Sequence, residues 1–142
     1  MRIFLDANIL FSAAKSDGAV RELLKLLRKA GHVLCADLYV ITEARRNLEA
    51  KSEAGVAVFE AMLRQIEVVP FRHHQLSAKR AASLPEKDRP VLAAALGEGC
   101  DALVTGDRRH FGKLYGQTID GLAIHSPSSL AEALLGASCD AW

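Results

Sequence analysis

The chain begins with MRIFLDAN (residues 1–8), and this stretch decides the fold. Residues 3–5 form a short apolar run that ends directly at the carboxylate of Asp6, a pattern typical of a buried strand in a parallel sheet. Because open α/β sheets bind ligands beyond the carboxyl ends of their strands, we expect Asp6 to lie at a functional site on a rigid support. The alternative is that Asp6 only caps a turn.

The same pattern recurs late in the chain as ALVTGD (residues 102–107), which places Asp107 after a second apolar run. Further short apolar runs alternate with helical periodicity, which predicts βαβ units and a parallel sheet between helix layers. The expected strands cover residues 3–5, 32–36, 67–70, 102–105 and 122–124. The fold class is therefore α/β, a three-layer α/β/α sandwich with a mostly parallel sheet of about five strands.

The helical segments are marked by their periodicity and by residues that favour helix ends. The first contains residues 20–27, with Asp17 as its expected cap and Gly31 as its stop. The second runs from Asp37 to about residue 48. The others are expected at residues 53–65, 76–83 and 88–96, and after Ser126-Pro127 up to Gly136.

The composition indicates an ordinary globular protein. The 142 residues are 50% hydrophobic and 25% charged, which predicts a single domain over residues 1–142. The net charge is only +1, so binding to nucleic acid has to come from local patches or from a metal.

Cysteine usage and targeting signals add little. The three cysteines (Cys35, Cys100 and Cys139) show neither a disulfide framework nor zinc-site spacing. Asp6 interrupts the first apolar run too early for a signal peptide, and no apolar stretch approaches the length of a membrane span. We expect a cytoplasmic protein with no membrane association.

Two further carboxylates stand near predicted helix starts. Pro90 is tolerated only in the first helical turn, which puts Asp88 at or near the N-cap of its helix. Glu43 lies in the helix after the second strand, at the edge of its buried face. The ordinary interpretations are that Asp88 is only a cap and that Glu43 is a solvated surface residue.

If these carboxylates meet, they need a cation. Two carboxylates about 4 Å apart repel each other by roughly 4 kcal/mol at an effective dielectric constant near 20. Oxygen ligands without a nearby cysteine select hard cations such as Mg²⁺ or Mn²⁺. Such a site suits phosphodiester hydrolysis, because the metal polarises the phosphate and activates a bound water.

Taken together, these residues resemble the PIN-domain ribonucleases, in particular the VapC-like toxins of toxin–antitoxin pairs. The resemblance runs from residue 3 to about residue 111 and rests on residues 5–8 (LDAN), Glu43, Asp88 with residues 91–95 (VLAAA), and residues 105–107 (TGD).

The resemblance implies a metal-dependent endoribonuclease that cleaves single-stranded RNA. It implies that Asp6, Glu43, Asp88 and Asp107 bind Mg²⁺ or Mn²⁺, with Asp6 and Asp88 as the expected direct ligands. It gives Asn8 and Thr105 supporting roles through hydrogen bonds. It also implies a cognate antitoxin and a homodimer. The apolar face of the helix at residues 53–65 is either the dimer surface or simply core.

Arg108 and Arg109 depart modestly from the family pattern. They follow the TGD turn directly, and they either contact the RNA backbone or form a solvated face.

Three other functions compete with a toxin ribonuclease. One is an RNA- or partner-binding module with an inactive or occluded site, and another is an RNA-processing nuclease that is not a toxin. A receiver-type phosphotransfer domain also places an Asp after its first strand, but no glycine-rich phosphate loop is present.

Overall fold

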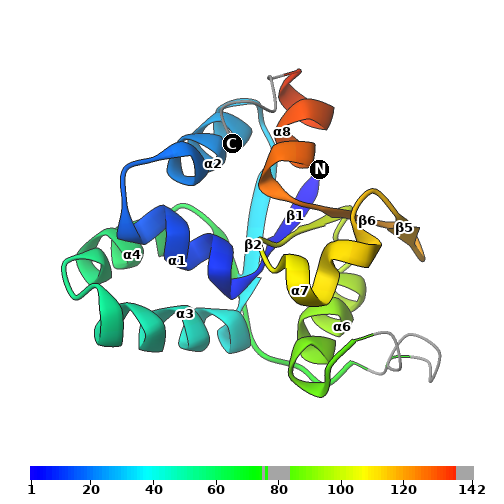
Figure 1. Cartoon of the computed structure of the whole chain (residues 1–142), viewed down its shortest axis with the longest axis horizontal. Helices are drawn as coiled ribbons and strands as arrows, with labels where there is room; N and C mark the ends of the chain where they lie inside the picture. The colour runs from blue at the N-terminus through cyan, green and yellow to red at the C-terminus, as the bar shows by residue number, and fades with distance from the viewer. Residues whose placement is uncertain (75, 77–83, 137–142) are drawn as a thin grey trace.

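A computed structural model describes residues 1–74, 76 and 84–136. A six-stranded sheet runs through its middle in the order β3-β2-β1-β4-β6-β5 (Figure 1). The strands are β1 (Arg2–Leu5), β2 (Val33–Asp37), β3 (Glu67–Val69), β4 (Ala102–Val104), β5 (Thr118–Ile119) and β6 (Leu122–His125).

The opening strand β1 lies inside the sheet, paired in parallel with both β2 and β4. Its residues Ile3, Phe4 and Leu5 have no exposed surface. Both of its faces are covered, which explains the continuous apolar run. β3 extends the parallel sheet beyond β2, and β6 extends it beyond β4. The predicted α/β class with a mostly parallel sheet is confirmed.

The number of strands was predicted as about five, and the structure has six. The additional strand, β5, pairs antiparallel with β6. Asp120 and Gly121 between them both have positive φ angles, 51° and 86°. An Asp-Gly pair with this conformation forms the tight turn of a β-hairpin. Two residues of strand are too short to show an apolar pattern, so only the turn could have revealed β5.

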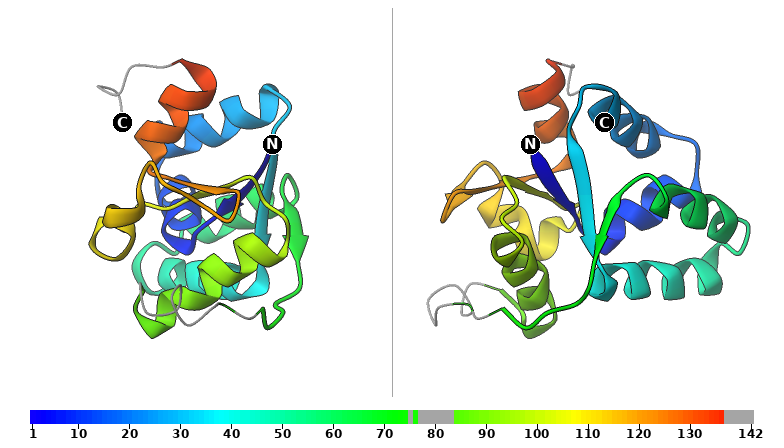
Figure 2. Two further views of the ribbon diagram at one scale, coloured as in Figure 1. Left: turned by 90° about the vertical axis from the view of Figure 1, so that its right-hand side faces the viewer. Right: turned by 180° about the vertical axis from the view of Figure 1, so that it is seen from behind.

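The helices pack on the two sides of the sheet, with α1, α2 and α4 on one side of β1 and β2 and α6 on the other (Figures 1 and 2). The longer helices are α1 (Ala7–Lys15), α2 (Ala19–Lys29), α3 (Leu38–Lys51), α4 (Gly55–Leu63), α6 (Arg89–Gly97) and α8 (Pro127–Leu135). The short ones are η1 (Glu86–Asp88), α7 (Arg108–Phe111) and η2 (Gly112–Leu114). The helix expected over residues 76–83 lies, apart from Leu76, outside the described residues.

Some predicted helix ends are confirmed and others are wrong. Asp37 caps α3 by accepting a hydrogen bond from the Val40 backbone, and Ser126 caps α8 in the same way. Asp17 does not cap α2, because Gly18 occupies the N-cap position and Asp17 instead pairs with Arg21 at 3.8 Å. Helix α1 was not predicted at all, although it begins immediately after Asp6.

The apolar face of α4 has two interpretations from sequence, dimer surface or core. In the structure this face packs against the core, and its use as a dimer surface stays a prediction. Phe59 is fully buried, and Val56, Met62 and Leu63 pack against the core of the same protomer. No helix in the described part of the chain is long and apolar enough to cross a membrane.

Gly55 is expected to be intolerant of even a methyl group. A Cβ there would lie 3.0 Å from the Ala14 carbonyl oxygen and 3.0 Å from Leu48 Cδ2. We therefore expect Gly55→Ala to lower the free energy of unfolding by about 1–3 kcal/mol, the usual cost of overpacking. Urea denaturation measures the difference. Gly112→Ala is the matched control, because Gly112 also has a helical conformation and its nearest contact is 3.9 Å away. An unaltered Gly55→Ala protein would contradict the packing argument.

Candidate functional site: a carboxylate hollow at the ends of β1 and β4

Asp6 is held in place by the ends of two adjacent strands. Its backbone N–H donates to the Val104 carbonyl at 3.1 Å, which continues the pairing of β1 with β4. Its side chain is 5% exposed and accepts hydrogen bonds from the Ala7 backbone at 2.7 Å and from the Thr105 hydroxyl at 2.8 Å. Asp6 therefore acts as a cap, but of helix α1 rather than of the turn that the ordinary interpretation expects, and its carboxylate also faces the end of β4.

Asn8 and Thr105 tie the two strand ends together. Asn8 Oδ1 accepts the Gly106 N–H at 2.7 Å, and its Nδ2 lies 3.4 Å from both Asp6 Oδ2 and Thr105 Oγ1. Thr105 Oγ1 also accepts the Asp107 N–H at 3.1 Å. One buried hydroxyl therefore links Asp6 to Asp107.

Removing that hydroxyl is expected to loosen the site without unfolding it. Thr105→Val keeps the shape of the side chain but takes a hydrogen bond from Asp6 Oδ2 and leaves the Asp107 N–H without its acceptor. Supporting residues of metal sites typically contribute 10–100-fold, so we expect the affinity for Mn²⁺ to fall by about that factor. Isothermal titration calorimetry measures it. Thr118→Val on exposed β5 is the control, and an equal loss there would show a general effect of the substitution.

Asp88 is the N-cap residue of α6 but does not act as its cap. Its side chain makes no capping hydrogen bond, and it is 8% exposed. The interpretation of Asp88 as only a cap is therefore wrong. Pro90 favours a helix start at this point, which leaves Asp88 in the turn directly before α6.

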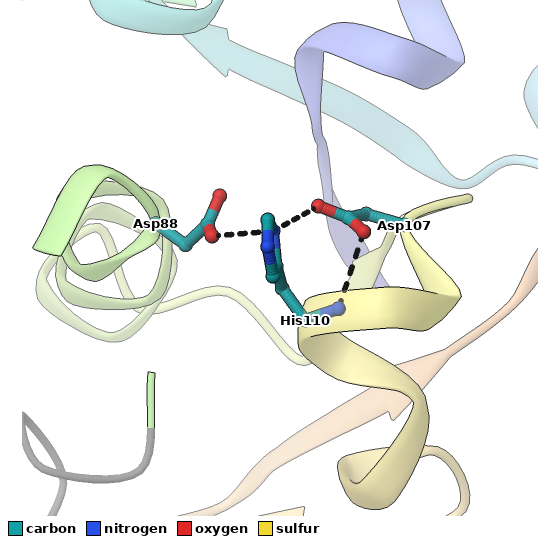
Figure 3. A group of neighbouring side chains, drawn as sticks. All are labelled: Asp88, Asp107 and His110. Atoms are coloured by element: carbon teal, nitrogen blue, oxygen red, sulfur yellow. Dashed lines mark hydrogen bonds and ion pairs between the residues drawn. The ribbon is translucent and has the colours of Figure 1, made fainter. Parts of the chain in front are cut away.

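His110 joins Asp88 to Asp107 (Figure 3). Its Nδ1 lies 2.7 Å from Asp107 Oδ2 and 2.9 Å from Asp88 Oδ2. Nδ1 carries at most one hydrogen atom, and only the contact to Asp107 has the geometry of a hydrogen bond. Among the described residues, Asp88 Oδ2 is thus a buried oxygen beside a nitrogen but without a hydrogen bond of its own.

His110 is the residue that sequence reasoning missed. It lies three residues after Asp107, on the same side of α7, and the Asp107 carboxylate also accepts its backbone N–H at 3.2 Å. Ligand atoms of Asp88, Asp107 and His110 all lie within 4.8 Å of one another. The i, i+3 spacing on a helical turn was the available signal, but nothing in the sequence brings Asp88 to it.

The four predicted carboxylates line one hollow of about 120 Å³. Asp6 and Asp88 are buried, Asp107 is half-buried and Glu43 is exposed. Asn8 lines the same hollow, while Thr105 lies behind Asp6. Three further polar side chains line it without having been predicted, namely Asn47, Lys51 and Lys87.

The electrostatics of the hollow disfavour ionised carboxylates. Burial, together with the nearby charges of Glu43 and Asp88, raises the pKa of Asp6 from 3.8 to about 6, although the hydrogen bonds from Thr105 and Ala7 oppose the rise. Burial and the charge of Asp107 raise the pKa of Asp88, while His110 and Lys87 oppose this. A cation bound in the hollow removes the penalty for ionising both side chains.

The donor set fits a hard divalent cation. It offers carboxylate oxygens from four segments of the chain, with no cysteine lining the hollow, and the His110 imidazole lies beside two of these carboxylates. Carboxylates suit Mg²⁺ and Mn²⁺, and an imidazole is compatible with Mn²⁺. Asp88 Oδ2 is buried and has no hydrogen bond, so it is available to bind such an ion.

Arg108 and Arg109 are both exposed on α7, directly after Asp107. Neither lines the carboxylate hollow, and Arg108 lines a separate one with Tyr115 and Pro127. Contact of either arginine with an RNA backbone stays a prediction.

Comparison with known proteins supports one family. A family model described as PIN domain matches residues 2–109. Among curated proteins, no significant sequence match was found.

Three solved structures share the fold. A chain of VapBC2 from Rickettsia felis, bound to a promoter DNA fragment, is 19% identical with a TM-score of 0.64, covering 89% of this chain and 98% of that chain. DNA-bound VapBC from Salmonella typhimurium gives 22% identity, a TM-score of 0.64 and the same coverage of 89% and 98%. The third is VapC20 of Mycobacterium tuberculosis, described as a sarcin–ricin loop cleaving toxin. It gives 16% identity and a TM-score of 0.50, covering 71% of this chain and 86% of that one.

Proposed function

The chain belongs to the PIN domain family, and on that basis we propose that it is a metal-dependent endoribonuclease acting on single-stranded RNA, the toxin of a toxin–antitoxin pair. The observation that carries the proposal is the convergence of Asp6, Glu43, Asp88 and Asp107 on one hollow. The structural neighbours named as VapBC complexes and as a sarcin–ricin loop cleaving toxin support the biological role.

Mg²⁺ or Mn²⁺ is the proposed cofactor. Asp6, Asp88 and Asp107 would hold it, with Glu43 at the exposed side of the hollow. When bound, such an ion polarises the scissile phosphate and lowers the pKa of a water molecule.

The chain's own residues would orient the metal ligands and supply positive charge near the RNA backbone. Thr105 and Asn8 fix the orientation of the Asp6 carboxylate through hydrogen bonds, so that it is preorganised before RNA arrives. Lys51 and Lys87, which line the hollow, supply positive charge beside the acidic centre, and the exposed Arg108 and Arg109 follow Asp107 directly in the chain. That charge offsets the repulsion between the carboxylates and the RNA backbone.

His110 supports a second candidate function, a PIN-fold binding module whose site is occluded. Its Nδ1 contacts oxygens of both Asp88 and Asp107. In this alternative the contacts persist and exclude metal. An RNA-processing nuclease that is not a toxin would use the same site, and growth arrest on expression without a partner separates it from a toxin.

We propose that the antitoxin binds this chain at a groove between α2 and α4. A groove of about 250 Å³ there has an apolar floor that includes Leu24, Leu34 and Met62. Lys25 and Arg28 are exposed on its rim. An amphipathic helix with acidic residues beside its apolar face would complement both features. A homodimer also stays a prediction, to be tested by sedimentation of the free protein.

RNA cleavage tests the proposed function. A pool of single-stranded RNAs is incubated with the protein while Mg²⁺ or Mn²⁺ is added and then chelated. We expect cuts that require metal and that disappear in Asp88→Asn. Absence of cuts with either metal would favour the occluded module. Cuts that persist in the chelator would exclude metal dependence.

A further inference from the structure

A second, larger hollow lies against the carboxylate hollow. It measures about 500 Å³, within the range of about 300–1,000 Å³ typical of small-ligand sites. Glu43, Lys87 and Asp88 line both hollows. The two hollows are therefore adjacent, and a group bound in the larger one lies next to the proposed cleavage centre.

The wall of this second hollow is aromatic. The ring centroid of Phe71 lies 5.6 Å from that of Tyr39 and 5.1 Å from that of His73. Phe71 is 38% exposed, although it is a large apolar side chain at the end of the sheet. The Tyr39 hydroxyl donates to the Lys87 carbonyl oxygen at 2.9 Å, which holds this ring beside the turn that carries Asp88. The exposed ring of Phe71 thus packs against Tyr39, whose own position is held by a hydrogen bond.

The rim of the hollow carries positive charge. Arg46 from α3 and Lys87 from η1 line it, and both side chains are exposed. An aromatic face flanked by cations has the composition of a single-stranded nucleic-acid site, in which bases stack on rings and cations contact the backbone.

We propose that this hollow binds one unstacked nucleobase of a single-stranded RNA, held by stacking on Phe71 while Arg46 and Lys87 contact the adjoining phosphates. The inference rests on the proposed function, because the shared residues Glu43 and Asp88 put that nucleotide beside the phosphodiester to be cut. The site supplies affinity and a preference for unpaired RNA, since a base inside a duplex cannot reach the ring.

The test measures stacking separately from cleavage. Short single-stranded RNAs carry the fluorescent base 2-aminopurine at one position in turn, and they are titrated with protein in a chelator so that the strand stays intact. We expect wild type to quench the fluorescence at one or two positions. Phe71→Ala should abolish the quenching and weaken binding at least about 5-fold, the lower end of the effect of one base-stacking contact.

Two substitutions distinguish stacking from simple apolar contact. Phe71→Trp keeps an aromatic face and should retain both quenching and affinity, whereas Phe71→Leu keeps apolar bulk and should lose the quenching. Leu26→Ala is the matched control, because Leu26 is a similarly exposed apolar residue, 36% exposed on α2. We expect it to bind RNA as wild type does.

The outcomes separate this inference from the proposed function. If Phe71→Ala binds RNA with unchanged affinity and quenching, the base site is overturned, whatever the cleavage assay shows. If wild type stacks the base but never cuts RNA with Mg²⁺ or Mn²⁺, the base site stands and the nuclease does not.

Discussion

Replacing Asp6 with asparagine is expected to abolish RNA cleavage and, at the same time, to stabilise the metal-free protein. The loss of activity should be at least about 1,000-fold, because Asp6 is a proposed ligand of the metal, such a ligand contributes several kcal/mol to the reaction, and each 1.36 kcal/mol is a factor of ten. The gain in stability follows from the burial of Asp6, whose pKa is raised from 3.8 to about 6 in the folded protein.

The pH dependence follows from the direction of this shift. Below about pH 3.8 Asp6 is protonated in both the folded and the unfolded chain, so its burial carries no ionisation penalty. Between pH 3.8 and about 6 the folded chain holds a proton that the unfolded chain releases, so stability falls as the pH rises. Above about pH 6 the penalty is complete and amounts to about 3 kcal/mol.

The asparagine side chain of the Asp6→Asn variant carries no charge, so the stability of the variant does not fall between pH 3.8 and about 6 for this reason. The gain in stability is partly offset, because an amide N–H group at the position of Asp6 Oδ2 cannot accept the hydrogen bonds that Thr105 and Asn8 donate there. We expect a melting temperature a few degrees above that of wild type at pH 7.5 without metal, and equal to or lower than that of wild type at pH 4.

Thermal unfolding with and without Mn²⁺ checks the argument. Wild type should gain stability from the ion, because a ligand that binds only the folded state must stabilise it, and the Asp6→Asn variant should gain much less. A variant that is less stable than wild type at pH 7.5 without metal would show that ionised Asp6 carries no penalty. Glu43→Gln is a useful comparison, since Glu43 lines the same hollow but is exposed.

Replacing His110 with alanine is expected to tighten metal binding about 10-fold or more. Nδ1 of His110 contacts the oxygens of Asp88 and Asp107 at 2.9 and 2.7 Å, where a cation would bind. A metal ion bound by these oxygens has to displace those contacts. A hydrogen bond to a charged group contributes about 1.5–3 kcal/mol, and without His110 that energy no longer opposes metal binding.

The same substitution should destabilise the metal-free protein by a similar amount. Without the imidazole, the carboxylates of Asp88 and Asp107 repel each other with nothing between them. Titration calorimetry gives the affinity for Mn²⁺, and urea unfolding gives the stability. Arg109→Ala, on the same short helix, is the control and should change neither. Weaker metal binding in His110→Ala would instead identify the imidazole as a metal ligand.

The sequence predicted the framework of the site because three of its four carboxylates follow a local signal, and only Glu43 lacks one. Asp6 ends an apolar run, Asp107 ends a second one, and Pro90 fixes the helix start at Asp88. These signals depend on neighbours in the chain, and the parallel pairing of β1 with β4 then brings the first two together. Their roles in binding metal stay predictions.

What the sequence could not reveal depends on contacts between distant segments. The link between His110 and Asp88 joins α7 to the turn before α6, and Phe71 reaches Tyr39 from another part of the chain. Helix α1 was missed for a different reason. Its apolar residues Ile9 and Leu10 continue the run of β1, and only the capping hydrogen bond of Asp6 marks where the strand stops and the helix begins.

The place of β1 inside the sheet also bears on how the protein emerges from the ribosome. Ile3 is synthesised almost a hundred positions before its partner Ala102 on β4. Contacts of such large sequence separation form slowly and only after the later segment is available. A nascent chain therefore cannot assemble the hollow until residue 107 has left the exit tunnel. A chain truncated before β4 lacks Asp107 and the partner strand of β1, so it cannot form the hollow at all.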